Sequence, residues 1–190
     1  MKQLITLAIL LLAIGACKKE TSQNLNNVQE LIKGVKHMEK KTEKLAKLKP
    51  ITKDEIKTWM PEKIGDLKRT AYNIGSQMGS STVSLDFKGD ENKRIKIKIL
   101  DGAGIGSPII AMYSMMTKMD IDKENESGYE RTETFNKQRV FIKYRSSNSY
   151  KKSEISYLFN ERFGIEANGW NMEPKELWSY IKKLNLKKLD

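Results

Sequence analysis

Two runs of alternating apolar and polar residues, joined by a short turn, constrain this fold more than any other feature of the chain. Apolar residues occupy every second position of residues 82–88 and again of residues 94–101. They are Val83, Leu85, Phe87, Ile95, Ile97 and Ile99. A period of two places alternate side chains on one face of a strand, and the Gly-Asp-Glu-Asn turn at 89–92 is typical of a hairpin. The pattern therefore predicts an antiparallel sheet with one buried and one polar face.

Five further segments have strand character, which brings the expected sheet to about seven strands. We expect strands at residues 67–76, 82–88, 94–101, 129–135, 139–146, 153–160 and 162–168. Residues 120–127 are acidic and polar, and we expect a loop there. Strand clusters interleaved with helices predict an α+β fold, in which helices pack on the antiparallel sheet. We assign this globular domain to residues 50–190.

Three helices are expected within the domain. Thr52 and Glu55 have capping-box spacing, which indicates a short helix that begins beside them. A second helix is expected from Ser107 to about Met119, and a third after Asn171, which can cap it. The spacing of the second helix predicts that these residues face inward: Ile109, Met112, Tyr113, Met116 and Met119.

Residues 28–49 are predicted to form a basic amphipathic helix in front of the domain. Apolar residues recur there at helical spacing, lysines occupy the opposite side, and Pro50 ends the segment. Three roles fit this helix: packing on the domain, a face for a partner helix or coiled coil, or contact with an anionic membrane. Lys36, Lys40 and Lys44 are its candidate contacts for a partner.

The N-terminal leader carries Lys2, an apolar run over residues 4–14, and Gly15-Ala16 directly before Cys17. These residues resemble the leader of bacterial lipoproteins, in which a signal peptidase cleaves before a lipobox cysteine after its thiol has been diacylated. The resemblance implies a signal peptide at residues 1–16, lipidation at Cys17 and a flexible polar tether over residues 17–27. An uncleaved signal anchor, or secretion with a chance cysteine, is the alternative, although a spanning helix needs about 20 apolar residues.

A lipoprotein leader implies a location in the cell envelope, and we expect the outer membrane with the domain facing the periplasm. Within the domain, residues 67–70, the Asp101-Gly102 strand end, residues 128–132 and residues 162–169 are similar to a family of uncharacterised bacterial envelope proteins. This resemblance covers about residues 52–189 and implies no reaction. The layout also resembles the PsbP and Mog1 type of α/β/α sandwich.

The formal net charge of +11 indicates an acidic partner or a lysine-rich solvated surface. Export argues against nucleic acid, so we expect an envelope protein or an anionic glycolipid, together with the membrane that holds the lipid anchor. Trp170 is the candidate aromatic contact, because it follows Gly169 at a strand end.

The residues favour binding over catalysis. His37 is the only histidine and lies outside the domain, so neither a Ser-His-Asp triad nor a histidine-rich zinc site can form. Four strand carboxylates are expected as surface charges on the polar sheet face: Asp86, Asp101, Glu154 and Glu166. We therefore predict a lipid-anchored, non-catalytic binding or assembly module without a cofactor or metal. The alternatives are a polyanion or anionic-lipid binder that acts through the lysine-rich helix, and a hydrolase with an unrecognised carboxylate site.

Overall fold

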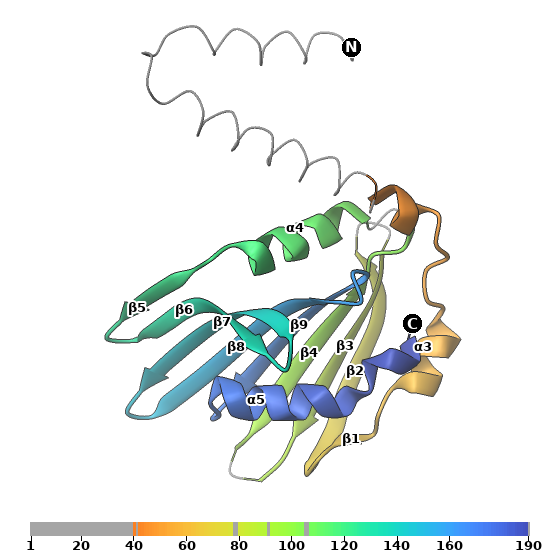
Figure 1. The fold of residues 1–190 in the computed structure, drawn as a ribbon. Coiled ribbons are helices and arrows are strands. Elements are labelled where there is room, and N and C mark those ends of the chain that lie inside the picture. Colours follow the sequence, from red (N-terminus) through yellow and green to blue (C-terminus); the bar gives the residue numbers. More distant parts are fainter. Residues whose placement is uncertain (1–39, 41, 78–79, 91, 105–106, 190) are drawn as a thin grey trace, which may run out of the picture. The chain divides into compact units, whose positions relative to one another are not determined.

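The computed structural model describes residue 40 and residues 42–77, 80–90, 92–104 and 107–189 (Figure 1). The chain divides into residues 1–40 and a compact unit of residues 41–190. Cys17, Lys36 and most of the predicted 28–49 helix lie outside the described residues. Lys40 and Lys44 lie within them and are exposed.

The described elements are two runs of consecutive strands, with a helix before, between and after them. In chain order they are α3 (Lys53–Trp59), β1 (Lys63–Ile64), β2 (Leu67–Gln77), β3 (Ser80–Lys88), β4 (Arg94–Asp101), α4 (Ser107–Lys118), β5 (Asp122–Asn125), β6 (Gly128–Phe135), β7 (Gln138–Ser147), β8 (Tyr150–Phe159), β9 (Phe163–Trp170), α5 (Pro174–Ile181), and the 3-10 turns η2 (Lys182–Leu184) and η3 (Leu186–Leu189).

The strands form one antiparallel sheet in the order β1-β2-β3-β4-β9-β8-β7-β6-β5 (Figure 1). Two meanders, β1 to β4 and β5 to β9, meet where β4 pairs with β9. The predicted α+β class with helices on an antiparallel sheet is confirmed, but the strand count of about seven is wrong, because the sheet has nine strands. The additional strands are β1, which has only two residues, and β5.

Strand β5 lies where a loop was expected from the sequence. Its four residues, Asp122–Asn125, are all exposed, and none of them is apolar. They pair with β6 at the edge of the sheet through backbone hydrogen bonds. The alternation that predicts strands depends on a buried face, so an edge strand with two wet faces carries no such signal.

The predicted hairpin is confirmed as β3 and β4. Val83 pairs with Ile99, Leu85 with Ile97 and Phe87 with Ile95, and all six side chains are at most 2% exposed. This face, the inner face, continues across β9 and β8 with Ile165, Ala167 and Ile155. It forms the main hydrophobic core.

Helices α4 and α5 pack on opposite faces of the sheet. Gly164 and Gly169 are five residues apart on β9, so side chains at these two positions would point to opposite faces of the sheet. A Cβ on Gly169 would lie 2.6 Å from the Met172 sulfur, at the start of the α5 segment, whereas a Cβ on Gly164 would lie 2.7 Å from the ring of Tyr113 on α4. Both glycines therefore give a helix close access to the sheet.

The inner face is covered by α5, η2, η3 and α3. The predicted capping box of α3 is confirmed, since the Glu55 backbone donates to the Thr52 hydroxyl and Glu55 accepts from the Thr52 backbone. The predicted cap of the last helix is wrong: Glu173 occupies the N-cap position. Asn171 instead adopts a left-handed backbone conformation and donates from Nδ2 to the carbonyl of Asn92.

Helix α4 covers only one end of the outer face. Ile110 packs there with Leu100 and with Leu45, which is 8% exposed, and the Arg139 side chain of β7 donates to the carbonyl of Thr117. The inward orientation predicted for two methionines is wrong: Met112 and Met119 are 60% and 50% exposed. Apolar residues occupy several sides of this helix, so their spacing did not select one face.

Candidate binding surface on the open sheet face

The part of the outer face that α4 leaves uncovered is polar and strongly basic. We call it the open face and define it by the side chains that share one face through direct strand pairing. Its basic members include Lys63, Lys68, Lys88, Arg94, Lys96, Lys98, Lys123, Lys143, Arg145 and Lys152, and its acidic members include Asp86, Glu130, Glu154 and Glu166. These residues alternate with the apolar residues of the inner face, so the same strands that build the core also align the charges.

Trp170 lies among these charges, at the end of the central strand β9. It is partly exposed and pairs directly with Arg94 on one side and with Lys152 on the other. The Arg94 guanidinium carbon lies 5.0 Å from the centre of the indole ring, and the Lys152 ammonium lies 5.7 Å from it. Both distances permit cation–π contact, so the ring is fixed between two cations.

Two carboxylates of the open face, those of Asp86 and Glu130, are each shared between two cations, whereas Glu154 pairs with Lys152. The Asp86 carboxylate lies 3.1 Å from Arg94 Nη2 and 3.9 Å from Lys96 Nζ. Glu130 likewise lies 2.9 Å from Arg145 and 3.7 Å from Lys143. The hydrogen bond from Arg145 is the main cause that lowers the pKa of Glu130. Because Asp86 and Glu130 each pair with two cations, the open face keeps an excess of positive charge.

An aromatic ring between two cations on a sheet surface can bind a ligand that has both an apolar surface and negative groups. The indole offers a flat apolar surface on which a ring or an apolar segment can stack, and Arg94 and Lys152 can pair with negative groups on either side. The site is built on three adjacent strands, which hold these groups in fixed register. It therefore suits an extended anionic ligand that lies on the sheet.

One of these residues was predicted from the sequence, and the others were missed. Trp170 was a candidate, whereas the basic candidates Lys36, Lys40 and Lys44 came from the helical segment. Leu45 packs beside Leu100, six residues along β4 from Arg94, which corresponds to about 20 Å. The structure thus does not bring Lys44 together with Trp170.

A signal for the missed residues was present in the strand sequence Arg-Ile-Lys-Ile-Lys-Ile-Leu at 94–100. Its basic residues alternate with buried isoleucines, so Arg94, Lys96 and Lys98 had to share the polar face of one strand. Their position beside Trp170 depended on the pairing of β4 with β9, which alternation along a single strand does not encode.

The expectation that the strand carboxylates are surface charges is wrong for Asp101. Its side chain is 2% exposed and accepts hydrogen bonds from Arg162 Nε at 2.7 Å and Nη2 at 2.9 Å. The backbone N–H groups of Ile51 and Ala103 donate to the same carboxylate at 2.8 and 3.0 Å. This ion pair joins the segment before α3 to the ends of β4 and β9.

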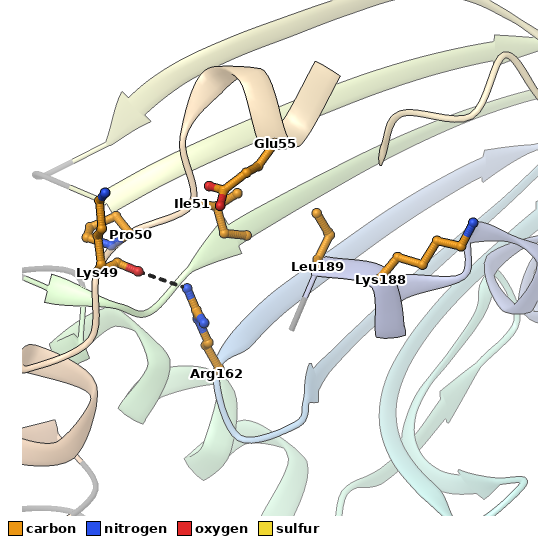
Figure 2. A pocket seen from close by; sticks show the side chains of 7 residues that line it. All are labelled: Lys49, Pro50, Ile51, Glu55, Arg162, Lys188 and Leu189. Atoms are coloured by element: carbon orange, nitrogen blue, oxygen red, sulfur yellow. Dashed lines mark hydrogen bonds between the residues drawn. The ribbon is translucent and has the colours of Figure 1, made fainter. Parts of the chain in front are cut away.

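A cavity of about 260 Å³ lies beside this ion pair (Figure 2). Its lining residues are Lys49, Pro50, Ile51, Glu55, Arg162, Lys188 and Leu189. Arg162 also donates to the carbonyl of Lys49, as Figure 2 shows, and Glu55 is engaged in the capping box. Hydrogen bonds from Thr52 lower the pKa of Glu55. Arg162 and Glu55 therefore serve the fold, and we favour the open face as the binding surface.

Among the described residues, no three or more His, Cys, Asp or Glu side chains are grouped so that they could hold a metal ion. Likewise, the described helices include none with the length and apolar character needed to cross a membrane. Comparison of the chain with protein-family models, with curated proteins and with solved structures finds no match.

Proposed function

We propose that this protein is a non-catalytic binding module of the cell envelope whose open face binds an anionic glycolipid. The observation that carries this proposal is Trp170, held in register between Arg94 and Lys152. A glycolipid headgroup combines sugar rings, which can stack on the indole, with phosphates or carboxylates, which can pair with the flanking cations.

The charge balance of the open face supports an anionic ligand. Asp86 and Glu130 are each shared by two cations, so a ligand phosphate would meet an excess of positive charge. Most of these cations are partly exposed, and their attraction to a ligand is therefore weakened by salt. Binding should accordingly depend on ionic strength.

The proposed membrane anchor places the domain near such a ligand. The leader resembles that of a bacterial lipoprotein, and a diacylated Cys17 would keep the protein on an envelope membrane without any spanning helix. We propose the periplasmic side of the outer membrane as this location.

Binding of the compact unit of residues 41–190 to vesicles tests the proposal. The probe is a vesicle that contains lipopolysaccharide in phosphatidylcholine, compared with a vesicle of phosphatidylcholine alone. Trp170→Ala should weaken binding to the first vesicle about tenfold, since it removes both the stacking surface and the cation–π contacts. Arg94→Gln should weaken it to a similar extent and should also reduce the dependence on salt.

Lys175→Gln is the matched control. Lys175 is an exposed lysine on α5, which packs on the opposite face of the sheet, so its loss removes the same charge without touching the open face. Trp170→Phe should retain part of the affinity because an aromatic ring remains. Equal weakening by Lys175→Gln and Arg94→Gln would contradict a localised site, and equal binding to both vesicles would contradict an anionic ligand.

A further inference from the structure

A second cavity, of about 530 Å³, lies beside α5 on the inner side of the sheet. Its lining residues are Asn136, Gln138, Tyr157, Phe159, Trp178, Ile181, Lys182, Asn185, Leu186 and Lys187. Tyr157 belongs to the inner-face register of β8, whereas Trp170 belongs to the outer face. The cavity is therefore separate from the open face, and binding in it does not depend on the function proposed for that face.

Three of the ten residues that line this cavity are aromatic. Tyr157 and Trp178 meet edge to face, with ring centres 5.3 Å apart and an angle of 74° between the rings. Phe159 also lines the cavity. The Trp178 indole N–H donates to Asn136 Oδ1 at 3.1 Å, which fixes the orientation of its ring. A preformed aromatic wall favours a ligand with a flat aromatic body, because ring pairs contribute beyond their buried area.

The Tyr157 hydroxyl is a polar group within this apolar wall. The residue is 3% exposed, but its hydroxyl is not among the fully buried side-chain atoms that lack a hydrogen-bond partner in the described part of the chain. Burial raises the pKa of Tyr157 far above its ordinary value, so the hydroxyl keeps its proton at physiological pH. Tyr157 lines the cavity, where a ligand oxygen can accept a hydrogen bond from its hydroxyl.

The charged groups that line this cavity are of one sign. Lys182 and Lys187 are exposed lysines, and the described lining contains neither Asp nor Glu. A ligand with a negative group would therefore meet attraction from both ammonium groups without a competing carboxylate in the lining. A neutral ligand would gain less from this arrangement, because it carries no charge opposite to that of the lysines.

We propose that this cavity binds a small aromatic carboxylate. The ring of the ligand packs against Trp178 and Phe159, its carboxylate accepts a hydrogen bond from the Tyr157 hydroxyl, and Lys182 and Lys187 supply the opposite charge. Each part of this assignment rests on a separate observation: the aromatic side chains, the tyrosine hydroxyl in the lining and the lysines without acids.

Isothermal titration calorimetry with three probes tests the assignment. The first probe is 2-naphthoate, the second is its neutral counterpart 2-naphthamide, and the third is decanoate, which keeps the carboxylate on an aliphatic body. We expect 2-naphthoate to bind in a one-to-one complex at least about tenfold more tightly than either of the others. Equal binding of the amide would overturn the role of the lysines, and tighter binding of decanoate would overturn the aromatic body.

Substitutions locate the site. Tyr157→Phe keeps the ring and removes only the hydroxyl, and it should weaken 2-naphthoate about tenfold because a hydrogen bond to a charged group is lost. Lys182→Gln should weaken 2-naphthoate but leave 2-naphthamide unchanged. Lys188→Gln is the matched control, since Lys188 is an exposed lysine that lines the other cavity.

The Trp178 indole N–H resonance provides a second readout that needs no variant. It should shift as 2-naphthoate is added to the wild-type protein, because its ring forms part of the proposed wall. An unchanged resonance at saturation would overturn the site. Equal loss of affinity in Lys182→Gln and Lys188→Gln would do the same.

Discussion

The Asp101 ion pair allows the sharpest test of how this fold is held together. Replacement by alanine removes the carboxylate that binds Arg162 through two hydrogen bonds and the backbone of Ile51 and Ala103 through one each. Arg162 is then left as a charge whose side chain is only 15% exposed. Loss of one partner from a buried ion pair costs about 3 to 5 kcal/mol.

The structure places Asp101→Ala near the lower end of that range. Arg162 borders the cavity of about 260 Å³, through which water can reach its guanidinium (Figure 2). We therefore expect the free energy of unfolding to fall by about 3 kcal/mol. For a domain of this size, that corresponds to a decrease in melting temperature of about 6 to 12 °C.

Urea denaturation followed by circular dichroism measures this change, and Asp86→Ala is the matched control. Asp86 also pairs with an arginine, but its partners Arg94 and Lys96 are 45% and 47% exposed, so the loss there should stay below about 1 kcal/mol. Asp101→Leu combined with Arg162→Met should be less damaging than Asp101→Ala, because no charge remains buried. Equal effects of Asp101→Ala and Asp86→Ala would refute the reasoning.

Two further predictions concern a hydrogen bond and the anchor. The Tyr180 hydroxyl donates to Asp66 at 2.8 Å; burial and this bond raise the pKa of Tyr180 from 10.0 to about 12, and the same bond lowers the pKa of Asp66 below 3.8. The pair therefore stabilises the fold at pH values between 3.8 and 10.0, the ordinary pKa values of the two groups. This stabilisation is lost as pH rises from 10 towards 12, and it is also lost as pH falls below 3.8. The stability difference between wild type and Tyr180→Phe, measured by urea denaturation, should therefore shrink at both extremes; a difference that does not vary with pH would argue against the bond. For the anchor, cells grown with a fatty-acid probe should label the wild-type protein but not Cys17→Ala, and label on both would show that Cys17 is not the lipidated residue.

The strands with a buried face were predictable from the sequence because burial imposes a period of two. The pairs Val83 with Ile99 and Leu85 with Ile97 follow from alternation on both sides of one turn. The edge strand β5 was not predictable, because its residues face water on both sides and are held by backbone hydrogen bonds. Likewise, the apolar surface of α4 covers more than one side, so the exposed positions Met112 and Met119 could not be separated from the buried ones.

The candidate site was likewise predictable from the sequence only in part. Trp170 and the basic alternation at residues 94–98 are features of the sequence, but their contact depends on the pairing of β4 with β9, strands that lie more than 60 residues apart in the chain. Asp101 shows the converse, since a carboxylate on a strand was expected at the surface and is buried against Arg162. An isolated carboxylate would not be buried there, and only the tertiary structure supplies its partner.

By itself, the sequence determined the antiparallel character of the sheet, the polar and apolar faces of its central strands and the capping box of α3. These properties are local, since each depends on residues a few positions apart. The tertiary structure alone decided the strand order, the covered and open parts of the outer face, and the two cavities. Those features depend on which distant segments pack together, and the free energy of that packing comes from contacts that no single segment of the sequence contains.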